Sequence, residues 1–409
     1  MGITTLLATA ALIAKYLILA VSYIGLGLGF FPGLRMNRAT IAIAGSAAVL
    51  ALGLLSLSEA WAAIDPTTIV FLFSTMVVNA YLSYSGFFQL ALFYLTRLTT
   101  SPFGLLVTLT FGSGLLSAVF LNDTIAIVFT PLTIALAQSL KLNPIPYLLA
   151  LAAATNLGSV ATLTGNPQNI LVGSFSGISY LFFAQVMSPI ALVGLAIQLG
   201  LLWWMYPEVR SLQPQTYCPT FRWRIHRPLL RKTLVVSVAM LAAFIVGLPL
   251  AQSAYVAAAL LLITRRIKPQ RVLKDVDWGV LVLFAGLFIL TRSLQNLNVL
   301  NGVANWANHP ASLTLLVTGL SNLISNVPAV LLLQTFVAPD DTQSWMLLAA
   351  GSTLAGNLTL FGAVANLITA EAAAAQGYPL SFWTHLKFGV PLTVMVLAIA
   401  YGWIVWQVP

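Results

Sequence analysis

The sequence has 409 residues, of which 59% are hydrophobic and only 7% are charged, and its formal net charge is +9. Soluble domains carry about 25% charged residues, so this composition excludes a soluble nucleic-acid-binding protein and indicates a polytopic membrane protein. The apolar runs are long and do not alternate, which favours helices over a β-barrel. The single cysteine, Cys218, excludes internal disulfides and a cysteine-type metal cluster.

The first 30 residues are apolar, and we interpret them as a first transmembrane helix rather than as a cleaved signal. The predicted elements are spans at 16–31, 41–57 and 67–84 and an interfacial helix at 85–100. Lys15 is expected to snorkel at one end of the first span. Arg35 and Arg38 place the first loop in the cytoplasm, whereas Glu59 and Asp65 fit the outside.

Residues 103–140 form two apolar arms around a polar tip, Asn-Asp-Thr at 122–124. Each arm has about 16–18 residues, near the lower limit for a span. Because Arg97 and Lys141 are both best placed inside, we favour a re-entrant hairpin that opens from the cytoplasmic face. Two full crossings would also satisfy these charges, but they would put Asp123 at the outer surface.

A stretch rich in amides interrupts the next apolar segment, 144–175. It runs Asn156-Leu-Gly-Ser-Val-Ala-Thr-Leu-Thr-Gly-Asn-Pro-Gln-Asn169. A helix that faces lipid cannot carry this composition, because each unpaired polar group in hydrocarbon costs several kcal/mol, and Gly165 and Pro167 break helical geometry. We therefore predict an unwound segment at membrane depth that lines a polar cavity.

The second half repeats this plan after a span at 182–206 and a basic cytoplasmic loop at 207–232. Its predicted elements are spans at 233–247, 250–264 and 278–296, a hairpin at 311–338 with the tip Ser325-Asn-Val-Pro328, a second broken helix at 343–374 and a last span at 388–406. Arg292 is expected to snorkel at the outer end of its span. The histidines, His226, His309 and His385, are expected in loops and show no metal-ligand spacing.

Two features make the second half an inverted copy of the first. The spacing Gly-x-x-x-Asn occurs at 165–169 and again at 362–366, an offset of 362 − 165 = 197 residues. The loop before Asp65 is predicted outside, whereas the basic loop before Asp277 is predicted inside. The predicted fold is an all-α polytopic membrane protein of two inverted-topology repeats, with about ten transmembrane helices, two re-entrant hairpins, two broken helices and both termini outside.

Four polar clusters are expected to converge at mid-membrane: the two hairpin tips and the two helix breaks. They contain no basic residue, so a bound anion would be held by helix N-termini, while unwound carbonyls suit Na⁺. Asp123 is their only carboxylate and is a candidate cation ligand or proton carrier; the alternative is that it caps the second arm of its hairpin. The asparagines of the breaks either line the site or bond neighbouring helices, at about 1 kcal/mol each.

These residues resemble those of a known family. The motifs Leu121-Asn-Asp-Thr124 with Thr130-Pro131, Asn156-Leu-Gly-Ser, Gly165-Asn-Pro-Gln-Asn169 and Ser325-Asn-Val-Pro-Ala329 resemble the ion transporter superfamily. Within it they are most similar to citrate-transporter-like permeases, which are grouped with arsenite permeases, NhaD-type sodium/proton antiporters and divalent anion:sodium symporters. The resemblance covers nearly the whole chain, from Gly25 to the last span.

The resemblance implies a homodimeric scaffold and a moving transport domain, an elevator. It divides the chain into a first repeat at 1–206 (scaffold 1–100, transport elements 101–206), the linker 207–232, and a second repeat at 233–409 (scaffold 233–296, transport elements 311–409). It implies substrate contacts at Asn122, Asp123, Thr124, Asn156, Thr164, Asn166, Asn326, Val327, Pro328, Asn357 and Thr359. It implies cation contacts at Asn122, Asp123, Thr124, Gly165 and Asn169 and at Ser325, Asn326, Gly362 and Asn366.

The tips depart from the family pattern. Sodium-coupled dicarboxylate members carry Ser-Asn-Thr at both tips, whereas this chain has Asn-Asp-Thr and Ser-Asn-Val-Pro. This difference leaves room for proton coupling through Asp123.

We therefore expect a secondary active transporter in the inner membrane of a prokaryote, which moves a small anion, a carboxylate or an inorganic oxyanion, with a Na⁺ or H⁺ gradient. No cofactor or metal is expected apart from Na⁺ as the coupling ion. The alternatives are a Na⁺/H⁺ antiporter of the NhaD type, an arsenite efflux permease and an ion channel with the breaks as its filter. An enzyme is not expected, because no nucleophile is paired with a base or metal, and a pump would need an ATPase partner.

Overall fold

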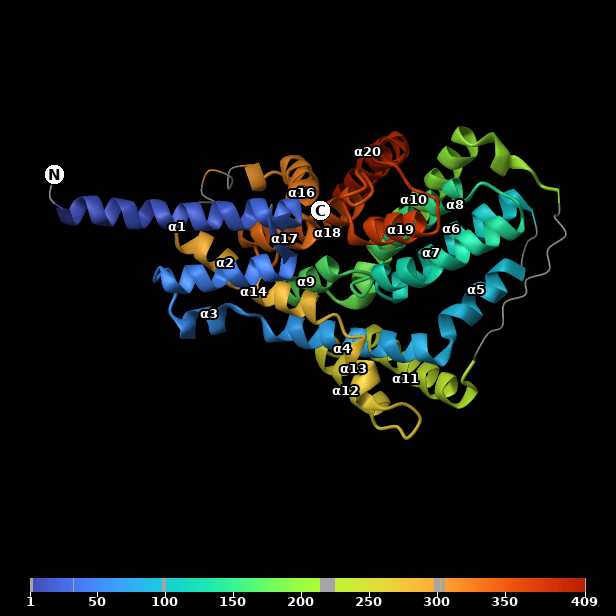
Figure 1. The fold of residues 1–409 in the computed structure, drawn as a ribbon, viewed down its shortest axis with the longest axis horizontal. Coiled ribbons are helices and arrows are strands. Elements are labelled where there is room, and N and C mark those ends of the chain that lie inside the picture. The colour runs from blue at the N-terminus through green and yellow to red at the C-terminus, as the bar shows by residue number, and fades with distance from the viewer. Residues whose placement is uncertain are drawn as a thin grey trace.

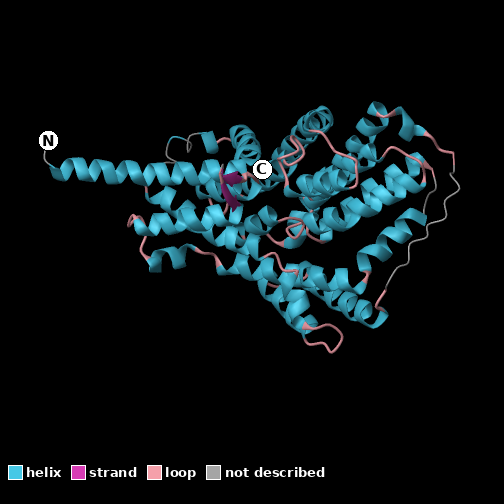
Figure 2. Ribbon diagram, in the orientation of Figure 1, coloured by secondary structure: helices cyan, strands magenta, loops and turns pink. Residues whose placement is uncertain are grey.

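The computed structural model describes residues 3–31, 33–97, 101–213, 225–297, 302 and 306–408. Residues 214–224 of the predicted linker, with Cys218, lie outside these ranges. The described chain is helical apart from one antiparallel ribbon of two short strands, β1 (Phe30–Phe31) and β2 (Leu34–Asn37) (Figure 2). Six of the described helices are long and apolar enough to cross a membrane, so the protein is an all-α polytopic membrane protein.

The first half consists of spans, a hairpin and a broken helix. These elements are α1 (Ile3–Leu28), α2 (Arg38–Ala51), α3 (Leu57–Ala63), α4 (Pro66–Ser85), α5 (Phe87–Arg97), the hairpin α6 (Pro102–Val119) and α7 (Asn122–Ser139), the broken pair α8 (Pro144–Ser159) and α9 (Pro167–Ser176), α10 (Tyr180–Met205) and the 3₁₀ turn η1 (Pro207–Arg210).

The second half has the same kinds of element in the same order. They are α11 (Arg227–Ile245), α12 (Leu250–Leu262), α13 (Pro269–Lys274), α14 (Trp278–Asn296), the hairpin α16 (Pro310–Ile324) and α17 (Asn326–Leu333) with the 3₁₀ turn η2 (Gln334–Phe336), the broken pair α18 (Thr342–Ala355) and α19 (Val364–Ala375), and α20 (Phe382–Gln407). Both predicted hairpins and both predicted breaks are therefore present.

Corresponding spans start with the same kind of cap. The Asp65 carboxylate accepts the Thr68 N–H at 2.8 Å at the start of α4, and the Asp277 carboxylate accepts the Val280 N–H at 3.0 Å at the start of α14. An acidic N-cap satisfies N–H groups that have no partner within the helix and complements the positive end of the helix. These two aspartates fix where the two spans begin.

The helices fall into two groups that meet in the middle of the molecule (Figure 1). α14 packs on α2 and α12 packs on α4, while α6 packs on α8 and α16 packs on α18. Glycine allows the tightest of these contacts: a Cβ on Gly158 of α8 would lie 2.0 Å from the Gly114 carbonyl oxygen of α6. Such close backbone packing is how membrane helices gain dispersion energy where the hydrophobic effect is absent.

Two predictions near the N-terminus are wrong. α1 begins at Ile3 rather than at residue 16, so Lys15 lies inside the helix and not at its end. No glycine or proline interrupts residues 3–15, and the helix therefore continues through them. α2 ends at Ala51 instead of 57, and the separate helix α3 follows, begun by a capping box in which Ser56 and Glu59 bond each other's backbone N–H.

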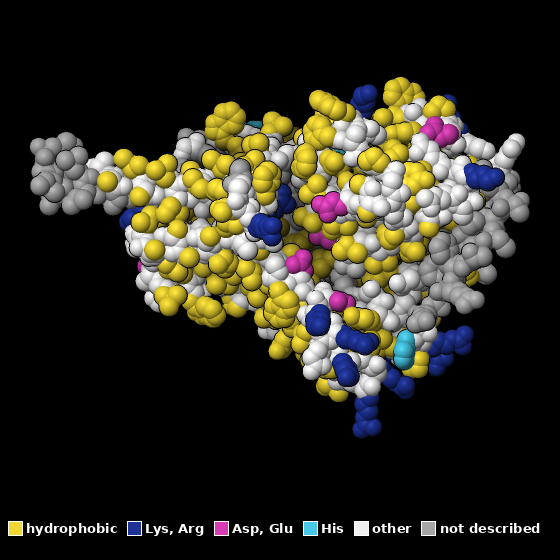
Figure 3. Space-filling view, viewed as in Figure 1, with side chains coloured by type: hydrophobic (Ala, Val, Ile, Leu, Met, Phe, Trp, Pro, Cys, Tyr) yellow, Lys and Arg dark blue, Asp and Glu magenta, His cyan; other side chains and the backbone are white. Residues whose placement is uncertain are grey.

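Two basic segments also differ from prediction. α11 starts at Arg227, within the predicted linker, and α20 starts at Phe382, so His385 and Lys387 are helical and do not lie in a loop. Ser381 caps α20 by accepting the Thr384 N–H at 3.1 Å, which is why this helix starts early. Lys and Arg side chains gather at one edge of the molecule, over α12, α13 and the start of α11 (Figure 3), as expected for the cytoplasmic side.

Candidate solute-binding site

Each hairpin tip is hydrogen-bonded to the glycine of a helix break. The Asn122 N–H donates to the Gly165 carbonyl at 3.0 Å, and the Asn326 amide donates to the Gly362 carbonyl at 3.1 Å. A Cβ on Gly165 would lie 2.3 Å from the Ser159 carbonyl oxygen, so only glycine fits there. The tips thus contact the breaks, as predicted. The contacts go to backbone carbonyls that would have accepted intrahelical hydrogen bonds if the helix had been continuous.

The two breaks are constructed alike. In each break one asparagine amide donates to the carbonyls of the residues ten and seven positions before it. The distances from Asn169 are 3.1 Å to Ser159 and 2.9 Å to Thr162, and those from Asn366 are 2.7 Å to Gly356 and 3.2 Å to Thr359. All three pairs of positions differ by 366 − 169 = 197 residues. Each amide replaces helical N–H groups that the break removes.

The two breaks also bind each other reciprocally. The Asn156 Nδ2 of the first repeat donates to the Asn366 Oδ1 of the second at 3.1 Å. The Thr353 hydroxyl of the second repeat donates to the Asn169 Oδ1 of the first at 3.2 Å. Positions 156 and 353 are again 353 − 156 = 197 residues apart. The contact therefore has approximate two-fold symmetry.

The buried asparagines of the two breaks already make hydrogen bonds through both atoms of their amides. Asn156 accepts from Asn122 at 3.3 Å and also donates to Asn357 Oδ1 at 2.9 Å. Asn166 donates to Thr353 at 3.1 Å and accepts the Asn169 N–H at 2.8 Å. A buried polar network that is fully satisfied rigidifies its surroundings. These side chains hold the tips and breaks together, and direct solute contacts from them remain a prediction.

The tips, in contrast, carry polar groups with unused bonding capacity. Asp123, Thr124 and Ser325 are partly exposed, and none of the described residues donates a hydrogen bond to the Asp123 carboxylate. The N-cap of α7 is Leu121, without a side-chain cap bond, so the alternative that Asp123 caps its helix is wrong. Ser325 has φ +80°, a strained conformation for a residue with a side chain.

The remaining predicted residues lie in the same region but make other contacts. Thr164 bonds the hydroxyls of Thr162 at 3.1 Å and Tyr180 at 3.3 Å. Thr359 donates to Asn322 at 2.9 Å, beside the second tip. Val327 and Pro328 form the first turn of α17, where Pro328 is buried and Val327 is partly exposed.

Sequence reasoning missed several residues of this network. Gln168 donates to Thr353 at 3.3 Å and to Asn326 at 3.2 Å, and so connects the first break to the second tip. Thr353 could have been found, because it is the counterpart of Asn156 at the 197-residue offset. Asn322 had a weaker signal, its position one turn before the tip.

His385 could not have been found from the sequence. It is 1% exposed, and its Nε2 lies 3.1 Å from the Asn357 carbonyl oxygen in the second break. One turn later, a Cβ on Gly389 would lie 2.2 Å from the same oxygen. α20 therefore covers the second break with a histidine and a glycine, an arrangement that depends on how α20 packs.

Comparison with known proteins places the chain among membrane transporters. The sequence model of the citrate transporter family matches residues 17–343. The silicon efflux transporter LSI3 of Oryza sativa subsp. japonica is 31% identical, over 90% of this chain and 92% of that protein. The inner membrane protein YbiR of Escherichia coli (strain K12) is 30% identical, over 84% of this chain and 89% of its own length.

A more distant relative and a solved structure extend the comparison. The putative transporter arsB of Dictyostelium discoideum is 23% identical, over 90% of this chain and 87% of its own. The crystal structure of the Alcanivorax borkumensis YdaH transporter superposes with a TM-score of 0.62 at 16% identity, covering 98% of each chain. At this identity the structural likeness concerns the fold alone.

Proposed function

The chain belongs to the citrate transporter family of membrane transporters, and from this premise we propose that it is a secondary active transporter of a small anion. The anion is a carboxylate or an inorganic oxyanion, and the driving force is a Na⁺ or H⁺ gradient. The observation that carries the proposal is the pair of helix breaks joined by reciprocal contacts beneath two hairpin tips, one of which presents an unpaired carboxylate.

Helix N-termini support binding of an anion. The helices α7 and α17 begin at the two tips, and α9 and α19 begin at the two breaks. Helix N-termini carry partial positive charge and unpaired N–H groups, and they bind anions without a basic side chain. This agrees with the lack of Lys and Arg in the four clusters, 122–124, 156–169, 325–328 and 357–366.

Asp123 supports coupling to a cation. Its carboxylate lies in the first turn of α7, is partly exposed and has no donor among the described residues. An acid at membrane depth that is not engaged in the structure is available to a Na⁺ ion or a proton. We assign it the coupling role, with the Gly165 carbonyl, which contacts the same tip, as an oxygen ligand of the first cation site. The Gly362 carbonyl belongs to the second proposed cation site, with Ser325, Asn326 and Asn366.

Alternating access is proposed to follow an elevator movement within a homodimer. The tips and breaks are joined by many hydrogen bonds and would move as one body. Their contact with the surrounding helices includes apolar pairs such as Phe175 of α9 and Phe288 of α14, with ring centroids 6.3 Å apart. Apolar contacts without directional bonds resist sliding less than hydrogen-bonded ones.

A second candidate is efflux of an uncharged weak acid that carries several hydroxyl groups. It is favoured by a relative described as a silicon efflux transporter, and by tips and breaks that offer amide donors and acceptors without fixed positive charge. A neutral solute with several hydroxyls would satisfy both kinds of group.

Transport into proteoliposomes tests the proposal. Labelled phosphate, sulfate, citrate and arsenite would be offered to purified protein with an imposed Na⁺ gradient, an imposed pH gradient or neither. We expect one solute to accumulate only with a gradient. Gradient-independent equilibration of arsenite would favour the second candidate, and proton movement driven by Na⁺ with no anion present would identify an antiporter instead.

A further inference from the structure

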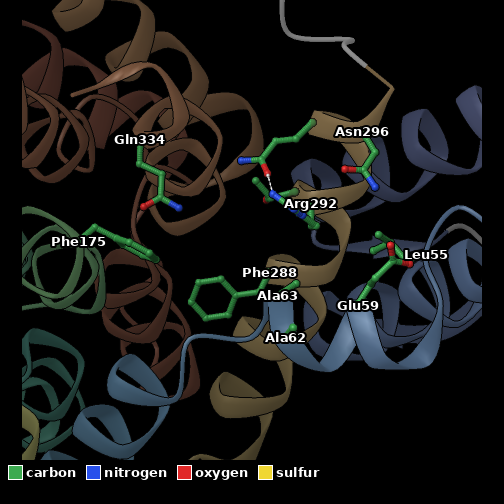
Figure 4. A pocket seen from close by; sticks show the side chains of 11 residues that line it. Leu55, Glu59, Ala62, Ala63, Phe175, Phe288, Arg292, Asn296 and Gln334 are labelled. Carbon is green, nitrogen blue, oxygen red and sulfur yellow. Dashed lines mark hydrogen bonds between the residues drawn. The ribbon is translucent and has the colours of Figure 1, made fainter. Parts of the chain in front are cut away.

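A cavity of about 490 Å³ lies at the C-terminal end of α14, whose N-terminal end adjoins the basic helix α13. We call it the vestibule. It is bounded by α3 and the end of α14 on one side, and by the end of α9 and the 3₁₀ turn η2 on the other (Figure 4). It therefore lies between helices assigned to the scaffold and helices assigned to the moving part. Its volume suits a small solute.

Arg292 of α14 is exposed near the end of its helix and lines this vestibule. Its Nη1 donates to the Gln295 side chain at 3.3 Å. A guanidinium has five N–H donors, and this bond uses one of them. In Figure 4 Arg292 lies between Gln334 on the side of η2 and Glu59 on the side of α3.

Gln334 supplies a second donor from the opposite wall. Its Oε1 is buried and has no partner among the described residues. Figure 4 shows this oxygen directed toward Phe175 and the Nε2 on the side of Arg292. The scaffold and the moving part thus each present an N–H donor to the same space.

Glu59 is the one acid among the residues that line the vestibule, and its carboxylate is engaged elsewhere. Its Oε2 accepts the Ser56 N–H and the Ser56 hydroxyl, both at 2.7 Å. These bonds hold the pKa of Glu59 below its ordinary value, and Arg292 adds a smaller effect in the same direction. The carboxylate is ionised at neutral pH, and its closest bonds fix the start of α3.

We propose that the vestibule is an external binding site for a small oxyanion, held by Arg292 from the scaffold and by Gln334 Nε2 from the moving part. Arginine binds carboxylates and phosphates through a planar fork, and an amide N–H can complete the contact. The inference that this ion is the transported substrate rests on the proposed function. The inference that the ion binds in the vestibule does not. Because the ion joins the two walls, its binding favours the arrangement seen here.

Chemical labelling tests the site without requiring transport. Ala62 is exposed and lines the vestibule, so an Ala62→Cys variant in a Cys218→Ser background reports on the local charge. The reagents are methanethiosulfonates that carry either a sulfonate or a trimethylammonium group. We expect Arg292→Gln to slow labelling by the sulfonate reagent about tenfold and Glu59→Gln to speed it, because local charge steers ionic reagents.

Arg266→Gln is the matched control, since it removes the same charge from a loop on the opposite side and should leave both rates unchanged. Inorganic phosphate or sulfate should protect Ala62→Cys from the sulfonate reagent, and this protection should disappear in Arg292→Gln and weaken in Gln334→Leu. Equal rates for both reagents whatever residue occupies position 292, with no protection by either oxyanion, would overturn the proposal. Protection in a protein that moves no labelled anion would refute the proposed function while leaving the site intact.

Discussion

Two asparagines carry much of the hydrogen bonding at the centre of this protein. Asn169 and Asn366 each donate to two carbonyls of the unwound backbone that an intact helix would have paired with its own N–H groups. An unwound backbone at membrane depth is tolerated only where such partners exist. The side chains of the breaks are therefore needed to make the breaks possible, whether or not they also touch solute.

Asn169→Leu should destabilise the protein. It removes the shorter hydrogen bonds to the Ser159 and Thr162 carbonyls and the acceptor of the Thr353 hydroxyl, which keep only weaker or other contacts. The loss is about 1–3 kcal/mol for each buried group left poorly paired. Thermal unfolding of the purified protein in detergent would measure the loss. Gln185→Leu is the control, because Gln185 is exposed on α10. Equal melting temperatures for the two variants would contradict this account of the breaks.

Asp123→Asn should abolish gradient-driven transport and leave the fold unchanged. No described residue donates a hydrogen bond to the Asp123 carboxylate, so its replacement by an amide of nearly the same shape breaks no hydrogen bond. Uptake with and without the gradient, together with a melting temperature, checks both parts. Glu371→Gln, an exposed acid on α19, is the control. Wild-type rates in Asp123→Asn would remove Asp123 from the coupling mechanism.

At the scale of elements, glycines decide which helices touch. Gly158 of α8 lies against Gly114 of α6, and Gly389 of α20 lies against the Asn357 carbonyl. Gly200 of α10, in contrast, has nothing within 4 Å of where a Cβ would be. The same residue type is therefore structural in two helices and dispensable in another.

Two Gly→Ala variants should change stability in opposite directions. Gly158→Ala places a methyl group 2.0 Å from a carbonyl oxygen and should cost about 1–3 kcal/mol or more through overpacking. Gly200→Ala adds only helix propensity and should gain about 0.5–1 kcal/mol. Melting temperatures of both variants and of the wild type in the same detergent measure these changes. A stabilised Gly158→Ala would mean that α6 and α8 can separate at little cost.

Composition predicted the elements that contain the site. Polar residues in apolar sequence located both tips and both breaks, because a helix that faces lipid cannot hold so many unpaired polar groups. The start of α3 was also encoded, by the capping box at Ser56 and Glu59, but hydropathy alone does not reveal it. The burial of His385 and the position of Arg292 in the vestibule depend on how distant helices pack, which single-sequence patterns do not contain.

At the scale of the whole molecule, the proposed movement requires α9 and α17 to slide past α14. Phe175 and Phe288 form one contact across that boundary, with ring centroids 6.3 Å apart. The vestibule lies beside the same contact, since both rings also line it.

A covalent link at this boundary should stop transport. Phe175→Cys with Phe288→Cys, in the Cys218→Ser background, would be joined by a short bifunctional thiol reagent that a reductant can cleave. We expect uptake to fall to background on linking and to return on reduction. Each single-cysteine variant treated in the same way is the control. Undiminished uptake by linked protein would exclude the elevator movement.

The reciprocal contact between the breaks has a consequence for ancestry. Each repeat supplies the partner that the other lacks, so a half-length chain with these contacts would be complete only beside a second copy of itself, inserted in the opposite direction. Gene duplication and fusion of such a chain would guarantee equal numbers of the two orientations. They would also release positions 156 and 353 from having to be identical, and today one offers an amide and the other a hydroxyl.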